Sequence, residues 1–362
     1  MTSGRDRRQI RIGELTTESG VLLSDVTLAL ETWGTLNAGR DNAILVLHAL
    51  TGDAHVVGPA GPDQPTPGWW DGLIGDGAPL DPARHFVVAA NVLGGCRGST
   101  GPSSIAPDGR PYGSRFPRIT PRDQVAAEAA LAEQLGIVSF AAVIGGSMGG
   151  MRALEWGVMY PERVEQVVAI ATCAAYSGDQ IAWSAPQLTA IRSDPQFRGG
   201  DYYDNGGKPP LAGMAIARQI AHATYRSALE LNTRFGRQQQ DGENVLGEGR
   251  FAVQSYLDHH GDKLASRFDP NSYLVLTESM NLHDIGRDRG GVQAALAKIS
   301  AEITVAVVDS DRLFPPAQGA EIATAPTARP LITLHSDYGH DGFLIEAEQI
   351  AAVVRSAVGP AN

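Results

Sequence analysis

A serine between two glycines is the residue whose setting points most directly to chemistry. Ser147 lies in the hexapeptide Gly-Gly-Ser-Met-Gly-Gly at residues 145–150, after an apolar run at residues 141–144 and before a helical pattern at residues 149–159. A sharp, strained turn from a strand into a helix needs small residues on both sides, and it projects the serine hydroxyl away from the sheet. The helix N-terminus then favours developing negative charge. The pattern predicts a covalent nucleophile at Ser147.

A glycine-rich turn between a strand and a helix can instead bind a phosphate or a nucleotide. That alternative requires either Gly-x-Gly-x-x-Gly or a Gly-Lys-Ser/Thr ending, and residues 145–150 contain neither. The Gly-x-Ser-x-Gly spacing is typical of the α/β-hydrolase fold, a mostly parallel sheet flanked by helices. In that fold the acid and then the histidine follow the serine along the chain.

Two aspartates compete for the position of the acid. Asp309 and Asp311 both follow the apolar run at residues 303–308, where a late strand is expected. Asp309 ends the strand itself, whereas Asp311 lies in the following turn, from which a carboxylate can reach a histidine. Asp311 is therefore the preferred candidate, and Asp309 would cap the turn.

Two histidines follow the last predicted strand, at residues 331–334. His335 continues this strand, so we expect it to pack against a neighbour. His340 lies in the glycine-flanked loop Tyr-Gly-His-Asp-Gly-Phe. It is predicted to take the proton from Ser147 as general base and to return it to the leaving group, while Asp311 fixes its tautomer and stabilises the imidazolium.

The same chemistry needs two backbone N–H groups aimed at the developing oxyanion. Met148, the residue after the nucleophile, is expected to supply one of them. The other is expected from Leu50, in the loop His-Ala-Leu-Thr-Gly-Asp at residues 48–53, which follows a predicted strand at residues 43–47. His48 could itself be catalytic, but it precedes the nucleophile, against the expected chain order.

Short apolar runs alternate with helical patterns, as in a parallel sheet covered by helices. Strands are expected at residues 43–47, 86–91, 141–144, 164–171, 303–308 and 331–334, and core helices at residues 122–135, 149–159 and 345–358. No buried strand is expected between residues 174 and 298. We therefore predict that residues 1–173 and 299–362 form the α/β-hydrolase core and that residues 174–298 form a helical cap, or lid, over the edge where such folds bind ligands.

Composition narrows the function classes. The 362 residues are 43% hydrophobic and 19% charged, with a net charge of −11. This balance disfavours nucleic-acid and membrane-surface binding, and no apolar run reaches the roughly 18 residues of a membrane helix. Cys96 and Cys173 are too few for a disulfide framework or a zinc site, so no metal is expected. Because no signal peptide is readable, a cytoplasmic location is expected.

A helical pattern in the predicted cap, at residues 211–227, carries three side chains that could bind a substrate. Arg218, His222 and Tyr225 share one face of it, and a guanidinium suits bidentate binding of a carboxylate. Asp341, next to the predicted general base, could pair with a substrate ammonium. From spacing alone, a solvated role is favoured for the helix face, and Asp341 could equally be a structural cap.

The sequence resembles the homoserine O-acetyltransferase family over nearly the whole chain. The resemblance rests on long strings at residues 47–53, 67–70, 91–102, 145–154, 222–227, 310–315 and 339–344. It implies transfer of an acetyl group from acetyl-CoA to the hydroxyl of L-homoserine, an early step of methionine biosynthesis. It also implies a covalent acetyl-enzyme, no permanently bound cofactor, and a homodimer joined through the cap helices.

The resemblance also implies roles for individual residues. The triad of the family falls on Ser147, Asp311 and His340. The homoserine-binding arginine and aspartate of the family fall on Arg218 and Asp341, which favours a substrate-binding role for both over the structural alternatives. Tyr225, which shares the helix face of Arg218, is a further substrate-binding candidate.

A catalytic triad does not define the acyl donor or acceptor, because esterases, peptidases and acyltransferases share it. A succinyl-CoA donor or an L-serine acceptor are alternatives within the transferase class, and a plain esterase is the alternative from another class. A succinyl donor would need a cation near the acyl pocket. The candidates are Arg97, Arg115 and Arg152, of which Arg152 is expected to face away from the site.

Overall fold

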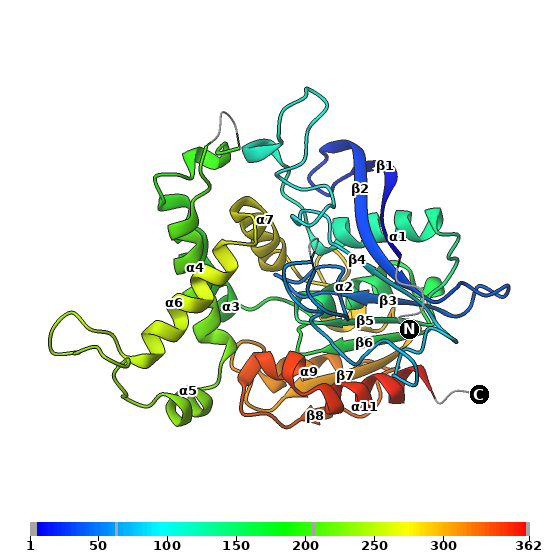
Figure 1. Cartoon of the computed structure of the whole chain (residues 1–362). Coiled ribbons are helices and arrows are strands. Elements are labelled where there is room, and N and C mark those ends of the chain that lie inside the picture. Colours follow the sequence, from blue (N-terminus) through cyan, green and yellow to red (C-terminus); the bar gives the residue numbers. More distant parts are fainter. Residues whose placement is uncertain (1–5, 62–63, 204–206, 360–362) are drawn as a thin grey trace.

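The structure, a computed structural model, describes residues 6–61, 64–203 and 207–359. In this part of the chain the central element is an eight-stranded sheet with the order β1-β2-β4-β3-β5-β6-β7-β8 (Figure 1). Its strands are β1 (Asp6–Thr16), β2 (Leu22–Trp33), β3 (Ala43–Leu47), β4 (Phe86–Ala90), β5 (Ala142–Gly146), β6 (Gln166–Ile170), β7 (Glu302–Val308) and β8 (Ile332–Leu334). The strands from β4 to β8 are parallel, and β1 and β2 are antiparallel. The mostly parallel sheet expected from the sequence is confirmed.

The parallel strands are buried on both faces. All residues of β3, β4 and β5 are buried, which explains why these strands are continuous apolar runs rather than alternating ones. In β3, Leu45 packs in the core formed with α1 (Pro121–Gln134) and α2 (Met148–Met159), and Ile44 packs in the core formed with α11 (Ala347–Val358). The sheet is therefore the middle of three layers, as helix-covered parallel sheets are.

A long antiparallel hairpin, β1 and β2, extends the sheet at one edge. This hairpin was not predicted from the sequence, in which the first expected strand lies at residues 43–47. In β2, Val26, Leu28 and Leu30 are buried and recur at every second position, which is the period of a strand. The intervening Thr27 is only half-buried, so the hairpin lacks the continuous apolar run that marks β3 to β7.

Between β6 and β7 the described chain forms helices and contributes no strand to the sheet. These helices are α3 (Gly178–Ser193), α4 (Leu211–Tyr225), α5 (Ala228–Arg234), α6 (Ala252–Ala265), α7 (Pro270–Asn281) and α8 (Val292–Leu296). Helix α4 packs against both α3 and α6, and the three stand to one side of the sheet (left in Figure 1). Helix α8 packs in the core through Ala295 and Leu296. None of the helices in the described residues has the length and apolar character needed to cross a membrane.

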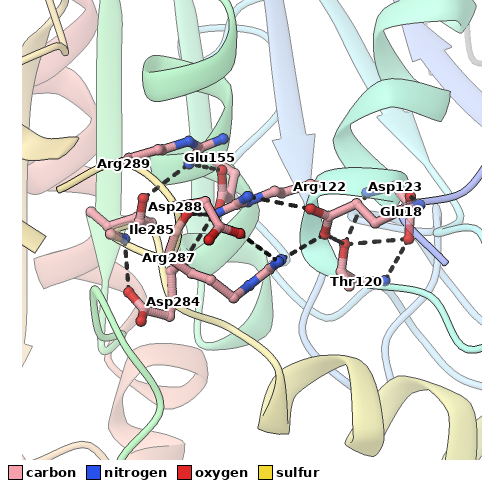
Figure 2. A network of polar contacts seen from close by, with 11 residues as sticks. Glu18, Thr120, Arg122, Asp123, Glu155, Asp284, Ile285, Arg287, Asp288 and Arg289 are labelled. Atoms are coloured by element: carbon pink, nitrogen blue, oxygen red, sulfur yellow. Dashed lines mark hydrogen bonds and ion pairs between the residues drawn. The ribbon is translucent and has the colours of Figure 1, made fainter. Parts of the chain in front are cut away.

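An ionic network fixes the helix that follows the predicted nucleophile (Figure 2). Glu155, a buried residue of α2, accepts hydrogen bonds from Arg122 at 3.4 Å and from Arg289 at 2.7 Å. Arg122 and Arg287 also pair with Glu18, in the turn between β1 and β2. Burial raises the pKa of Glu155 although the two arginines oppose this effect. A buried carboxylate needs such charged partners. Because the partners of Glu155 come from different segments, the network joins α1, α2, the β1–β2 hairpin and the segment that returns from the cap.

Candidate active site

Ser147 occupies the strained turn between β5 and α2. Its backbone has φ 56° and ψ −124°, a conformation that residues other than glycine rarely adopt and that concentrates at functional sites. The flanking glycines are required by close approach of the backbone. A Cβ at Gly145 would lie 2.2 Å from the carbonyl carbon of Gly149, and one at Gly149 would lie 2.1 Å from the carbonyl oxygen of Leu47. The Gly-x-Ser-x-Gly pattern thus reflects a turn in which helix and strands touch.

His340 lies between Ser147 and Asp311. Its Nε2 is 2.9 Å from Ser147 Oγ, and its Nδ1 is 2.6 Å from Asp311 Oδ2. The other carboxylate oxygen, Oδ1 of Asp311, accepts hydrogen bonds from the backbone N–H groups of Leu313 and Phe314, both at 2.8 Å. Since Nδ1–H donates to the carboxylate, Nε2 of the neutral ring accepts the hydrogen bond of the serine hydroxyl. The structure thus brings the three predicted residues into a proton-transfer arrangement in which all three are buried.

The competing aspartate and histidine form a separate pair outside this site. His335 Nδ1 is 2.9 Å from Asp309 Oδ2, and the His335 side chain is 80% exposed. Because Asp309 follows β7 and His335 follows β8, the neighbouring strand, the two side chains meet at one edge of the sheet. Neither makes a hydrogen bond to Ser147 or His340.

Leu50 and Met148 lie at the same edge of the sheet. Leu50 follows β3, and Met148 follows the turn after β5, which is the parallel neighbour of β3. Met148 is the first residue of α2, where backbone N–H groups lack helical acceptors. No described residue accepts a hydrogen bond from the N–H of Leu50. Both N–H groups are therefore available to an oxyanion.

The cap contributes Arg218 and Tyr225 from α4, close to Asp341. The Arg218 guanidinium lies 5.0 Å from the centre of the Tyr225 ring, and this ring lies 5.8 Å from that of His340. Burial raises the pKa of Tyr225. Burial also raises the pKa of Asp341, although the charges of Arg218 and Arg226 act to lower it. A partly buried cation and a partly buried carboxylate thus lie on the cap side of His340.

His222, the third residue of the predicted helix face, is directed elsewhere. Its Nε2 is 2.8 Å from the hydroxyl of Tyr256, and its ring stacks on His260 at 4.0 Å between centres. Both partners belong to α6. Burial and the neighbouring arginines lower the pKa of His222, so it is neutral and packs between two cap helices.

Two arginines that the sequence analysis assigned no role contact the site. Arg226 Nε lies 3.3 Å from Asp341 Oδ2. Arg226 follows the last residue of α4 in an extended conformation, so helical periodicity does not predict its direction. Arg267 donates to the carbonyl of Thr51 in the loop of Leu50, at 3.2 Å. Burial and the charges of Arg218 and Arg97 lower the pKa of Arg267 to about 10. Positive charge is therefore concentrated around Arg267.

The three arginines considered for a succinyl carboxylate lie in different surroundings. Arg115 pairs with Asp108 at 2.6 Å on the exposed surface. Arg152 is buried, pairs with Glu128 and donates to the carbonyl of His48 at 2.6 Å. Arg97 donates to the backbone carbonyl of Arg267 at 2.7 Å. The guanidiniums of Arg115 and Arg152 are therefore committed to carboxylates.

The described part of the chain offers neither a cluster of candidate metal ligands nor a reactive thiol. That part contains no group of three or more His, Cys, Asp or Glu side chains that could hold a metal ion. Cys96 and Cys173 are free thiols, and burial raises the pKa of both, that of Cys96 to about 11. A thiol with a raised pKa is a poor nucleophile, so Ser147 is the better candidate.

The fold and this site define an enzyme of the α/β-hydrolase fold, and a family model described as alpha/beta hydrolase fold matches residues 42–347. Among curated proteins, homoserine O-acetyltransferase of Thermobifida fusca (strain YX) is 60% identical over 352 residues, covering 97% of this chain and 93% of the relative. The enzyme of the same name from Mycobacterium tuberculosis (strain ATCC 25177 / H37Ra) is 52% identical over 354 residues, covering 98% of this chain and 93% of that relative. The chain therefore belongs to the homoserine O-acetyltransferase family, which confirms the resemblance inferred from the sequence.

Solved structures with the same fold carry two kinds of names. Homoserine O-acetyltransferase from Bacillus anthracis superimposes with a TM-score of 0.90 at 25% identity, covering 99% of each chain. Esterase E22 superimposes with a TM-score of 0.88 at 27% identity, covering 98% of this chain and 100% of that one. Because transferases and esterases share the architecture almost completely, the distinction between them depends on the site rather than on the fold.

Proposed function

We propose that this enzyme transfers an acetyl group from acetyl-CoA to the hydroxyl of L-homoserine through an acetyl-Ser147 intermediate, in methionine biosynthesis. The observation that carries the proposal is the placement of Arg218 and Asp341, of opposite charge, on the cap side of the base His340. An amino-acid acceptor carries one carboxylate and one ammonium, so it matches this pair. The family membership supports the same reaction.

In the first half-reaction, Ser147 Oγ attacks the thioester carbonyl while His340 Nε2 takes its proton. The carbonyl oxygen becomes an oxyanion that the N–H groups of Leu50 and Met148 stabilise. When the tetrahedral intermediate collapses, the C–S bond breaks and His340 Nε2–H protonates the departing CoA thiolate. Asp311 stabilises the imidazolium formed on the way.

In the second half-reaction, the nucleophile is the homoserine hydroxyl, where a hydrolase would use water. His340 Nε2 takes the hydroxyl proton, the new C–O bond forms at the acetyl carbonyl, and the oxyanion is stabilised by the same two N–H groups. Collapse breaks the bond to Ser147 Oγ, which regains a proton from His340. Both half-reactions therefore use one proton-transfer pair, and the enzyme returns to its starting state.

The acceptor is held by charges on both of its ends. Arg218 binds the carboxylate of homoserine, with its guanidinium placed against the ring of Tyr225. Asp341 binds the ammonium group, next to the base that activates the hydroxyl. Arg226 balances the charge of Asp341 when no acceptor is bound. Holding the acceptor beside His340 gives it a large advantage in effective concentration over water.

The surroundings of the arginines support acetyl over succinyl as the acyl group. Arg115 and Arg152 are paired with carboxylates, so of the three candidate arginines only Arg97 remains for a succinyl carboxylate. The positive charge around Arg267 instead suits the phosphates of CoA, which either donor carries.

Product analysis tests the proposed reaction against its alternatives. The enzyme is incubated with acetyl-CoA and succinyl-CoA in competition, with homoserine or serine as acceptor, and with an aryl ester as a control substrate. We expect O-acetylhomoserine as the main product. Succinylated product, preferential use of serine, or rapid aryl-ester hydrolysis unaffected by homoserine would overturn the assignment of donor, acceptor or class, respectively.

We also propose a homodimer joined through the cap helices α3 and α4. Trp183 on α3 and Ile216 on α4 are large apolar side chains that are 43% and 48% exposed. An apolar hollow of about 650 Å³ lies between the two helices and is lined by Ile216 and Ile220, among others. Apolar patches of this kind mark association surfaces. In sedimentation experiments, the unmodified enzyme should be a dimer and the Ile216→Glu variant a monomer. An unmodified enzyme that sediments as a monomer would contradict the proposal.

A cytoplasmic location is proposed on the basis of the two free thiols, Cys96 and Cys173. Free cysteines are common where thiols are kept reduced. Cell fractionation with activity assays checks this proposal, and activity confined to the membrane or the medium would contradict it.

A further inference from the structure

His48 is a fully buried histidine that the proposed proton transfers do not use. It follows β3 directly, at the start of the loop that carries Leu50, and it is 1% exposed. Its Nε2 lies 3.0 Å from the backbone nitrogen of Val92, and its Nδ1 lies 2.7 Å from the carbonyl oxygen of Ala49. Both ring nitrogens thus contact the backbone rather than another titratable side chain.

These two contacts define the tautomer of His48. The backbone N–H of Val92 can only donate, so Nε2 accepts. In the neutral ring the proton is then on Nδ1, which donates to the carbonyl of Ala49. Burial and the charge of Arg152 lower the pKa of His48 to about 3, so the ring is neutral at neutral pH.

The carbonyl that His48 holds belongs to the peptide group of a proposed oxyanion donor. The carbonyl of Ala49 and the N–H of Leu50 are in one trans peptide group, so they point in opposite directions. Ala49 O accepts from His48 Nδ1 and also from the N–H of Gly52, at 2.9 Å. With both acceptor positions of this oxygen filled, the Leu50 N–H has one direction available, and no described residue accepts it.

A second contact links the loop to the helix that carries the other donor. Arg152, on α2, donates to the carbonyl oxygen of His48 at 2.6 Å. The Arg152 guanidinium is held by Glu128, which also accepts from Trp156 Nε1 at 2.8 Å. Since Met148 begins α2, the two N–H groups of the oxyanion site are connected through His48 and Arg152.

We propose that His48 is a positioning residue of the oxyanion site, whose neutral Nδ1–H holds the peptide group of Ala49 and Leu50 so that the Leu50 N–H meets the oxyanion of both half-reactions. The inference rests on the proposed acyl transfer through Ser147. It assigns a role to a residue that touches neither substrate, and it predicts effects on rates rather than on substrate affinity.

Two substitutions separate the contacts of the ring. In His48→Asn, the amide N–H lies near the position of Nδ1 and can still donate to Ala49 O, while the acceptor for Val92 is lost. In His48→Gln, the longer side chain can place its carbonyl near the position of Nε2 and accept from Val92, while the donor to Ala49 is lost. We expect kcat to fall on the order of 10²-fold or more in His48→Gln, comparable to removal of an oxyanion donor, and on the order of tenfold or less in His48→Asn.

The readout that distinguishes positioning from general stability is the affinity for a transition-state mimic. A small alkylboronic acid forms a tetrahedral adduct with Ser147 whose oxygen occupies the oxyanion position. We expect its affinity to fall in parallel with kcat in His48→Gln, whereas the KM for homoserine stays unchanged. Equal kcat losses in the two variants, or unchanged boronate affinity in His48→Gln, would overturn the proposal.

A measurement on the unmodified enzyme keeps the proposal testable if His48→Gln does not fold. In a crystal structure of the boronate adduct, we expect one boronate oxygen within about 3 Å of the Leu50 nitrogen, a normal hydrogen-bond length, with the His48 contact to Ala49 intact. An oxygen placed elsewhere overturns the inference. Formation of an acetyl-enzyme by the unmodified protein tests the proposed function separately, so the two failures are distinguishable.

Discussion

Replacing Asp311 with asparagine should reverse the tautomer of His340. Asp311 Oδ1 accepts from the backbone N–H groups of Leu313 and Phe314, so the amide oxygen of the asparagine will occupy that position and its NH₂ group will face His340. Nδ1 must then accept a hydrogen bond, and the ring proton moves to Nε2. The base that faces Ser147 is thereby replaced by a donor, although no side chain changes its place.

The expected loss of kcat is large because the variant loses both the correct tautomer and the charge that stabilises the imidazolium. Substitutions of this kind in serine–histidine–aspartate triads cost on the order of 10⁴-fold. This corresponds to about 5.5 kcal/mol of transition-state stabilisation. Both half-reactions should be affected, since His340 serves as base in each.

Release of CoA from acetyl-CoA in a single turnover measures the first half-reaction directly. The matched control is Asp309→Asn, the same substitution two residues away, at a carboxylate that pairs with His335 on the surface. We expect Asp309→Asn to retain nearly full activity. A loss of less than about tenfold in Asp311→Asn, or equal losses in the two variants, would refute the role given to Asp311.

Three further predictions follow from the charges around the site and behind it. Arg226→Gln should raise the KM for homoserine on the order of tenfold to hundredfold, because without the charge of Arg226 the pKa of Asp341 rises further and less of the carboxylate is ionised to bind the ammonium group, while CoA release from acetyl-CoA stays unchanged; an equal effect on both would place Arg226 outside the acceptor site. Since the pKa of Asp341 is raised, its carboxylate gains a proton at a higher pH than an exposed aspartate does. As the pH is lowered, kcat/KM for homoserine should therefore fall before kcat/KM for acetyl-CoA, and superimposable profiles would contradict the ammonium-binding role. Glu155→Gln should lower the free energy of unfolding by about 3–5 kcal/mol, because Arg122 and Arg289 lose a buried partner; urea denaturation measures this, and a change below about 1 kcal/mol would show that solvent screens the network.

The core of the fold and the arrangement around Ser147 could be predicted because both depend on local patterns. Strands β3, β5, β6 and β7 are buried on both faces, so each is an apolar run that is visible in the sequence. The turn at Ser147 requires glycines for steric reasons that involve residues close in the chain and one neighbouring strand. The chain order of the triad in this fold then predicts the acid in the turn after β7 and the histidine in the loop after β8.

The features that the sequence analysis missed depend on contacts between distant segments. The β1–β2 hairpin lies at a sheet edge, and its apolar signal is diluted because the half-buried Thr27 and the buried polar residues Glu31 and Thr32 interrupt the apolar residues of β2. Arg226 lies just beyond the end of α4, and its contact with Asp341 spans the junction of cap and core. The role inferred for His48 depends on the direction of one peptide group, which composition and spacing do not encode.

On helix α4, helical periodicity predicted the surroundings of two side chains correctly and those of a third incorrectly. Arg218 and Tyr225 lie where helical periodicity places them, next to Asp341 and His340. His222 belongs to the same pattern, but it packs against Tyr256 and His260 of α6. A helix within a layered cap has neighbours on several sides, so periodicity identifies a face without identifying what covers each part of it.

The measurement that tests the central claim most directly is the fate of an acetyl group placed on Ser147. The enzyme is mixed with acetyl-CoA without acceptor, the modified peptide is identified by mass, and the purified acetyl-enzyme is divided between buffer and buffer with homoserine. We predict that Ser147 carries the acetyl group, that it is stable in buffer, and that homoserine removes it rapidly as O-acetylhomoserine. Absence of an acetyl-enzyme, or its discharge to water at the same rate with and without homoserine, would contradict acyl transfer through Ser147.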